Sequence, residues 1–377
     1  MKGFINALLD LIRLFVPLFP SSAPGVAFIV HMRNVDDVYR KFPLFKIFPE
    51  SFTLRFFRFM WPITVSHITG LHSLVTGNAI PGWIISIPLT ARQMLENREY
   101  AKRKILQAVR VAEHRGARLA SLGALTASLT HGGTYIADRT PVVVTTGHAY
   151  TVHNVTQTVL NIMQAVGRTP GNTTLAIVGA NGSIGSNCAR VLARSTFKKI
   201  LLVDIVRRSD GLDELCDEVK NHCQATEVII DHRISSIKEA DIIIAATNAP
   251  EALIRADDLK SGTVVVDDAQ PTDVASSVFE RDDVLVLEAG AVRTPGISAN
   301  FDIDLQNSDD NYSCLVESFI LAATENYEAH VLGRPTLEQI DTMGSEGARL
   351  GFRTANFQNM FGLIDEKKIA HIRSKQV

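Results

Sequence analysis

Apolar residues follow two patterns along the chain, and each pattern predicts a different kind of element. Short continuous apolar runs, such as GVAFIVHM (25–32) and GWIISIPL (82–89), are typical of buried strands. Apolar residues at every third or fourth position favour helices over 90–115 and 149–167, the second ending at Gly167. Between these helices, RLASLG (118–123) predicts a strand that leads into a glycine-rich loop.

The middle of the chain alternates strands with helices. Its apolar runs are LAIVGA, KILLVDIV, EVIID, DIIIAA, TVVVDD and VLVLEA, and helical stretches begin near 183 and 213. Strands without polar alternation are expected in a parallel sheet with helices on both faces. The predicted fold class is α/β: an N-terminal α/β lobe (1–150) that binds substrate, a Rossmann-type parallel-sheet dinucleotide domain (151–300), and a C-terminal helical segment (301–377).

The first residues are strongly apolar but are interrupted by charges. In FINALLDLIRLFVPLFP, the residues Phe4, Leu8, Leu11, Ile12 and Phe15 recur at helical spacing. The apolar stretch is too short and too broken to span a bilayer. We expect an amphipathic helix that either docks on its own protein or lies on a membrane surface. The phenylalanine-rich segment 42–59, with its interleaved Lys and Arg, fits such a peripheral membrane contact and equally fits an entrance for an apolar substrate.

Net charge and cysteine content give no reason to expect nucleic-acid binding or a metal site. The 377 residues carry a net charge of -2, which gives no electrostatic reason to expect nucleic acid as a partner. The four cysteines (188, 216, 223 and 314) lack the paired spacing of a metal knuckle, so we expect no metal site and a reducing, cytoplasmic location.

The strongest chemical signal is a glycine-rich turn. LAIVGANGSIGSNCARVLA (175–193) places three glycines directly after a predicted strand and at the start of a helix. Glycines there allow a sharp turn and a close approach to a pyrophosphate, whose charge meets the helix N-terminus. The predicted cofactor-binding residues of this turn are Gly179, Asn181, Gly182, Ser183, Ile184 and Gly185.

Residues at the ends of later strands complete the predicted dinucleotide site. Asp204 ends the second strand, where a carboxylate accepts hydrogen bonds from a ribose and repels a 2'-phosphate. Arg207 and Arg208 follow and could instead hold that phosphate, which leaves NAD(H) and NADP(H) both open. Ala246 and Thr247 end a further strand on the cofactor side.

Four segments of the chain resemble one known family. They are RKILQAVRVAEHRGARLASLGALTA, VTTGHAYTV, VGANGSIGSNCARVL and YSCLVESFILAATENYE. Together they resemble the cyanobacterial-type long-chain fatty acyl-ACP reductases, which make fatty aldehydes. The resemblance implies that Cys314 accepts the acyl group of a long-chain thioester and that a nicotinamide cofactor then delivers hydride.

Two features depart from that family. Residues 1–25 form an extension that the family pattern lacks, and the family has no carboxylate at the place of Asp204. Its members resemble NADPH-dependent enzymes, so the presence of Asp204 leaves both NADP(H) and NAD(H) as possible cofactors. It also leaves open whether the thioester partner is carried on acyl carrier protein or on coenzyme A.

The local sequence around Cys314 agrees with a nucleophilic role. We expect Asp310 or Ser313 to cap the following helix, so that Cys314 lies in its first turn, where the helix dipole favours a thiolate. Of three histidines considered as its proton-transfer partner (131, 148 and 153), His148 ranks first, because it stands at the entry of a helix. Cys188, by contrast, lies within the glycine-loop helix, where core packing accounts for it.

Two other functions remain open. The first is a shikimate-dehydrogenase-like oxidoreductase of a small polar substrate, which would want a lysine and an aspartate at the nicotinamide. The second is a non-catalytic protein that binds a nucleotide or an acyl group.

Overall fold

The computed structural model describes residues 2–204, 210–301 and 303–375, and these form two compact units. Unit 1 comprises Met1–Gly147, Thr294–Gly333 and Arg349–Gly351. Unit 2 comprises His148–Arg293, Arg334–Ala348 and Phe352–Val377. The segment 301–377, expected as one C-terminal helical region, is therefore divided between the two units.

Unit 1 is built on a mainly parallel sheet with the strand order β13-β2-β3-β1-β4-β5. Strands β3, β1, β4 and β5 run parallel to one another, whereas β2 pairs antiparallel with β3 and β13 antiparallel with β2. The strands are β1 (Gly25–Met32), β2 (Ile63–Thr69), β3 (Gly82–Thr90), β4 (Ala117–Leu122), β5 (Val143–Thr145) and β13 (Ser298–Ala299).

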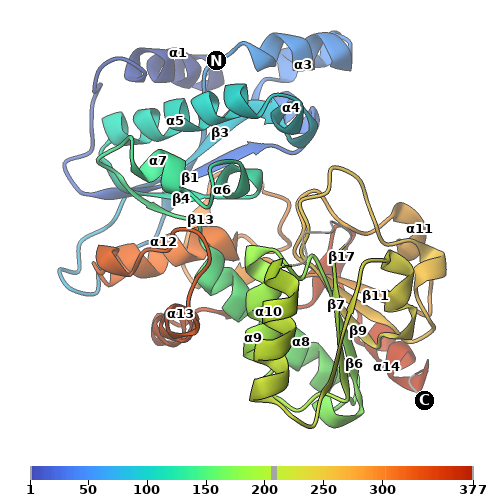
Figure 1. The fold of residues 1–377 in the computed structure, drawn as a ribbon. Coiled ribbons are helices and arrows are strands. Elements are labelled where there is room, and N and C mark those ends of the chain that lie inside the picture. The colour runs from blue at the N-terminus through green and yellow to red at the C-terminus, as the bar shows by residue number, and fades with distance from the viewer. Residues whose placement is uncertain (1, 205–209, 302, 376–377) are drawn as a thin grey trace. The chain divides into compact units, whose positions relative to one another are not determined.

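Helices pack on this sheet through their apolar residues. Helix α5 buries Ala101, Ile105 and Val109 in the same core as Ile85 and Ile87 of β3. In Figure 1, α5 lies beside β3 and α12 lies below β4. The helices of unit 1 are α1 (Lys2–Arg13), α2 (Asp36–Lys41), the 3-10 helix η1 (Pro43–Ile47), α3 (Glu50–Arg58), α4 (Ala91–Glu96), α5 (Arg98–Arg115), α6 (Leu125–Leu129), α7 (Thr134–Ala137), α12 (Ser313–Ala323) and η5 (Tyr327–Ala329); the short strand β14 (Asp310–Tyr312) precedes α12.

Two local predictions for unit 1 are wrong. The helix expected over 90–115 is broken at Asn97, because the side chain of Asn97 accepts a hydrogen bond from the backbone amide of Tyr100 and so caps a new helix. The glycine-rich loop expected after β4 contains the short helices α6 and α7, and its glycines Gly132 and Gly133 have positive φ angles.

Unit 2 has the Rossmann architecture that the sequence predicts. Its main sheet is entirely parallel, in the order β11-β10-β9-β6-β7-β8, which is the dinucleotide-fold order with β6 as the first strand. The strands are β6 (Thr174–Val178), β7 (Lys199–Val203), β8 (Glu227–Asp231), β9 (Ile242–Ala245), β10 (Val264–Asp267) and β11 (Leu285–Glu288).

The remaining elements of unit 2 are helices and short strands outside this sheet. The helices are α8 (His148–Ala165), α9 (Ser183–Leu192), α10 (Asp210–His222), α11 (Ser276–Phe279), α13 (Leu337–Arg349) and α14 (Glu366–Lys375), with the 3-10 turns η2 (Pro170–Asn172), η3 (Ile234–Glu239) and η4 (Ala256–Asp258). Short strands are β12 (Ala291–Arg293), β15 (Arg353–Thr354), β16 (Gln358–Asn359) and β17 (Gly362–Leu363). The chain order reverses between β6 and β9, and a ligand binds in such sheets outside the strand ends at that point.

Candidate active site

The glycine turn of unit 2 leaves no room for side chains. Gly179 has φ +82°, and a Cβ there would lie 2.6 Å from the carbonyl oxygen of Ala246. A Cβ on Gly185, in the first turn of α9, would lie 2.3 Å from the carbonyl oxygen of Gly179. A backbone cradle of this kind at a helix N-terminus fits a pyrophosphate, so the residues present fit a nicotinamide dinucleotide.

Asp204 stands where the sequence places it, directly after β7. One of its carboxylate oxygens accepts a hydrogen bond from the backbone amide of Asn181, at 3.1 Å. The carboxylate therefore holds the glycine turn while it marks the position where the adenosine ribose binds in this fold. Arg207 and Arg208 lie outside the described residues.

Arg334 is a residue of this site that the sequence does not reveal. Its guanidinium donates to the carbonyl oxygen of Asn181, at 2.7 Å. It reaches the glycine turn from a point 153 positions later in the chain, so no local pattern could connect the two. Arg334 adds a positive charge beside the expected phosphate position.

His148 and Ser183 meet at the beginning of α8 and α9. The ring nitrogen Nδ1 of His148 lies 2.9 Å from the hydroxyl oxygen of Ser183, at hydrogen-bonding distance. His148 is the first residue of α8, as expected, and Ser183 is the first residue of α9. The imidazole is thus fixed beside the dinucleotide turn.

The strand ends of unit 2 carry buried carboxylates. Thr247, which follows β9 and Ala246, donates its backbone amide to Asp273 at 3.0 Å. Burial raises the pKa of Asp267, the last residue of β10, to about 7, although the hydroxyl of Thr272 donates a hydrogen bond to it. Burial likewise raises the pKa of Asp268 and of Asp273.

Cys314 lies in unit 1, half-buried, in the first turn of α12. This position in the helix agrees with the prediction. The predicted cap by Asp310 or Ser313 does not form. The N-cap residue is Tyr312, whose hydroxyl donates to the carbonyl oxygen of Ile303, and Asp310 instead accepts a hydrogen bond from the side chain of Asn307. Ser313 is the first residue of the helix itself.

The backbone of Cys314 is held tightly by its neighbours. The hydroxyl of Ser121, in β4, donates to the carbonyl oxygen of Cys314 at 2.6 Å. Gly147 has φ +74°, and a Cβ there would lie 2.4 Å from the Cα and from the carbonyl oxygen of Cys314. Any side chain at position 147 would displace this helix start.

A buried carboxylate follows on the next turn of the same helix. Glu317 is fully buried and accepts a hydrogen bond from the hydroxyl of Thr145, the last residue of β5. Thr145 in turn accepts from the backbone amide of Val331 at 3.1 Å. Glu317 lies three positions after Cys314, a spacing that brings side chains to neighbouring places on a helix. Sequence reasoning missed this residue, because a glutamate in a helix is usually solvated.

The other cysteines and histidines lie in different surroundings. Cys188 is fully buried, as its place in α9 predicts, and burial raises the pKa of its thiol. His153 packs against Gly344 of α13, and burial lowers its pKa. His131 is exposed, with a φ of +55°. Its Nε2 lies 3.4 Å from the Lys102 amine.

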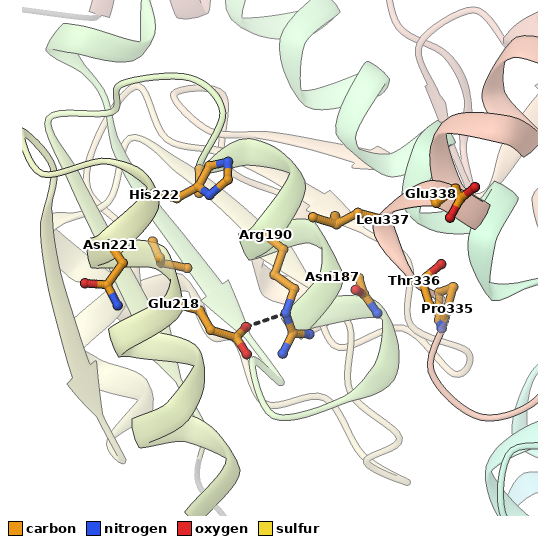
Figure 2. A pocket seen from close by; sticks show the side chains of 11 residues that line it. Asn187, Arg190, Glu218, Asn221, His222, Pro335, Thr336, Leu337 and Glu338 are labelled. Carbon is orange, nitrogen blue, oxygen red and sulfur yellow. Dashed lines mark hydrogen bonds and ion pairs between the residues drawn. The ribbon is translucent and has the colours of Figure 1, made fainter.

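A pocket of about 730 Å³ lies elsewhere in unit 2 (Figure 2). It is bordered by α9, α10 and the segment 335–338, and an ion pair between Arg190 and Glu218 crosses one side at 2.6 Å. None of the three turn glycines lines it. Its lining residues are Asn187, Arg190, Ala193, Glu218, Val219, Asn221, His222, Pro335, Thr336, Leu337 and Glu338.

The parallel sheet, the glycine cradle and the strand-end carboxylate define a class: the protein is an NAD(P)-dependent oxidoreductase of α/β fold. The family model for shikimate / quinate 5-dehydrogenase matches residues 163–293, which is about a third of the chain and contains the whole parallel sheet of unit 2.

Two curated relatives extend the similarity beyond that domain. The aminotransferase PigE of a Serratia species is 26% identical over 306 residues, covering 79% of this chain and 35% of that protein. The long-chain acyl-[acyl-carrier-protein] reductase of Synechococcus elongatus is 26% identical over 314 residues, covering 77% of this chain and 85% of that protein. The chain thus spans about a third of the first relative and most of the second.

Solved structures are similar only at a distance. Quinate dehydrogenase from Corynebacterium glutamicum in complex with NAD is 11% identical, with a TM-score of 0.37 over 87% of this chain and 100% of that one. The nucleotide-binding domain of glutamyl-tRNA reductase from Thermoplasma volcanium is 20% identical, with a TM-score of 0.27 over 35% of this chain and 84% of that one.

Proposed function

We propose that this oxidoreductase reduces a long-chain acyl thioester to a fatty aldehyde, with Cys314 as the acyl acceptor. The observation that carries the proposal is one of chain connectivity. Gly147 lies against the backbone of Cys314, and the next residue, His148, lies at hydrogen-bonding distance from Ser183 of the dinucleotide turn. A single peptide bond therefore links the residue beside the proposed nucleophile to the residue beside the cofactor cradle.

The two curated relatives support the same chemistry. An acyl-thioester reductase that releases its product after one hydride transfer makes an aldehyde, and an aldehyde is the kind of carbonyl compound that an aminotransferase converts to an amine. Each relative aligns with more than three quarters of this chain, which is more than unit 2 alone contains, so each alignment extends into unit 1. A segment common to both relatives that produces or binds an aldehyde would explain why one is named a reductase and the other an aminotransferase.

In the proposed first step, the thiolate of Cys314 attacks the thioester carbonyl carbon. The tetrahedral oxyanion forms at the start of α12, where the helix dipole stabilises negative charge. Collapse expels the carrier thiolate and leaves the acyl group bonded to the Cys314 sulfur. Ser121 and Gly147 fix the backbone from which this sulfur projects.

The second step transfers two electrons as a hydride. When bound, the nicotinamide supplies a hydride to the carbonyl carbon of the acyl-cysteine. The C–S bond of the resulting hemithioacetal then breaks, which releases the aldehyde and returns the Cys314 thiolate. In the first step one proton is needed for the carrier thiolate that departs. We assign its supply to His148, because the preceding residue, Gly147, lies against the backbone of Cys314.

Intact mass spectrometry tests the assignment of Cys314. The full chain is incubated with a long-chain acyl thioester without cofactor, and the acyl adduct is expected in the wild type and absent in Cys314→Ala. The matched control is Cys223→Ala, a buried cysteine whose thiol pKa is lowered by hydrogen bonds with Thr226 and Thr196. An adduct that persists in Cys314→Ala and disappears in Cys223→Ala contradicts the proposal.

The family-model match favours a second candidate, the oxidation of a small polar alcohol of the shikimate type. That reaction requires a lysine side chain that accepts the proton of the substrate hydroxyl. Three lysines of unit 1 donate hydrogen bonds within that unit: Lys41 to the carbonyl of Val65, Lys102 to Glu99, and Lys104 to the carbonyl of Met60. Shikimate- or quinate-dependent reduction of NAD(P)⁺, undiminished in Cys314→Ala, would establish this candidate instead.

A further inference from the structure

The first helices of unit 1 turn large apolar side chains outward. We call this surface the phenylalanine face; it is formed by α1 and the following turn, by η1, and by α3. Exposed contiguous apolar patches of this kind usually mark a binding surface. Its exposed members are Phe4, Ile5, Leu8, Ile12, Phe15, Val16, Phe19, Leu44, Ile47, Phe48, Phe52, Phe56 and Phe59.

Ring-to-ring contacts join these elements into one surface. The ring of Phe4 on α1 packs against buried Phe42 with centroids 5.0 Å apart, and Phe42 packs against Phe45 of η1 at 6.5 Å. From Phe45 the contacts continue to Phe48 at 5.8 Å and to Phe56 of α3 at 5.4 Å. Figure 1 shows α1 and α3 along the same border of unit 1.

The opposite side of α1 is anchored in unit 1, which fixes the orientation of the face. Asp10 is fully buried and accepts hydrogen bonds from Arg115 at 2.8 Å and from the backbone amide of Thr64 at 2.7 Å. The indole of Trp61 donates to the carbonyl oxygen of Ala7 at 2.5 Å. An amphipathic helix normally buries its apolar stripe, whereas α1 is held through Asp10 and exposes most of it.

Positive charge borders the phenylalanine face. In the segment 42–59 the charged residues are Lys46, Arg55 and Arg58 against the single acid Glu50. Arg55 and Arg58 also line a pocket of about 660 Å³ at the edge of α3, together with the hydroxyl-bearing Ser51 and Tyr100. Guanidinium groups bind phosphate through paired hydrogen bonds, so this pocket suits an anionic headgroup.

We propose that the phenylalanine face docks on the surface of a bilayer that contains anionic phospholipid, with Arg55 and Arg58 at the headgroup phosphates. Apolar side chains combined with a cationic border are typical of proteins that lie in the interface. No helix in the described ranges is long and apolar enough to cross a membrane, so the proposed contact is with one leaflet.

The charge pattern favours lipid over a second copy of the chain. A twofold contact through this face would bring the same surface patch of two copies together, and with it the same cations. Anionic lipid neutralises them instead. The inference rests on unit 1 alone and does not depend on the proposed reaction.

Vesicle co-sedimentation of the full chain tests the inference. The wild type is expected to sediment with phosphatidylglycerol-containing vesicles and much less with pure phosphatidylcholine, and high salt should weaken the binding. The double variant Phe52→Ser/Phe59→Ser should bind at least ~10-fold more weakly, a loss of ~1.4 kcal/mol or more. Arg55→Gln/Arg58→Gln should lose the preference for the anionic lipid.

Phe361→Ser is the matched control, because Phe361 of unit 2 is 73% exposed and Phe59 is 72% exposed. It should bind vesicles as the wild type does. The inference is overturned if the wild type does not sediment with vesicles, or if Phe361→Ser weakens binding as much as the double variant. A wild-type dimer that the double variant converts to monomer, without any vesicle binding, would make the face an interface between copies.

Discussion

At the scale of single residues, backbone crowding around a few glycines is the clearest determinant of the site. Gly179, Gly185 and Gly147 each approach another backbone so closely that a Cβ would overlap it. In unit 2 the crowding shapes a surface for a pyrophosphate, and in unit 1 it positions the start of the helix that carries Cys314. The close contacts exclude a side chain at all three positions, and Gly179 and Gly147 also have positive φ angles.

Gly185→Ala should weaken dinucleotide binding at least ~10-fold, since its Cβ would lie 2.3 Å from the carbonyl oxygen of Gly179 and would move the turn. Gly171→Ala is the control, because its Cβ would have its nearest neighbour 4.0 Å away. Cofactor titration by fluorescence measures both. Equal affinities for the two variants would show that the turn does not bind the dinucleotide.

A second residue-scale prediction concerns Asp267 and pH. Burial raises its pKa to about 7, above the value of about 3.9 in an unfolded chain, so the folded state binds the proton more tightly. Its stabilising contribution is complete below pH ~4 and is lost as the pH rises to ~7. Asparagine does not ionise, so the Asp267→Asn variant does not lose this stabilising contribution as the pH rises.

Urea unfolding of wild type and Asp267→Asn over this pH range measures the effect. The free energy of unfolding of the wild type, relative to the variant, should fall by as much as ~4 kcal/mol between pH 4 and pH 7. A difference that does not change with pH would mean that Asp267 titrates alike in the folded and unfolded states.

At the scale of elements, much of the fold could be predicted from apolar runs. All six strands of the main sheet of unit 2 coincide with such runs, because strands covered on both faces need apolar residues throughout. The break at Asn97 could not be predicted, since the apolar period continues across it and the cap depends on one side chain. The outward direction of the α1 stripe depends on the distant partner Arg115 of Asp10, which no local pattern shows.

Helix α1 should therefore be sensitive to Asp10. Asp10→Asn leaves the buried guanidinium of Arg115 without its charged partner and should lower the free energy of unfolding by ~3–5 kcal/mol. Asp304→Asn is the comparison, because Asp304 is about half exposed and its ion pairs with Arg33 and Arg40 should contribute less than ~1 kcal/mol. Chemical denaturation measures both, and equal effects would mean that the buried pair does not anchor α1.

At the scale of the whole molecule, the chain crosses repeatedly between two compact units. The family model covers residues 163–293 and therefore only part of unit 2, whereas Cys314 lies in the segment 294–333 that belongs to unit 1. The sequence predicts the dinucleotide turn because its residues are contiguous. It does not predict Arg334 or the hydrogen bond between Thr145 and Glu317, because these contacts join positions more than 150 residues apart.

The most direct test of the proposed reaction is a single turnover of the isolated acyl-enzyme. The wild type is acylated with a long-chain thioester, freed of excess substrate and mixed with NADPH or NADH, and the aldehyde and the intact protein mass are measured. Aldehyde equal to the bound acyl group, with return to the unmodified mass and oxidation of one cofactor per acyl group, is the result that the proposal predicts. Release of free fatty acid, or an acyl-enzyme that keeps its mass with both cofactors, would contradict it.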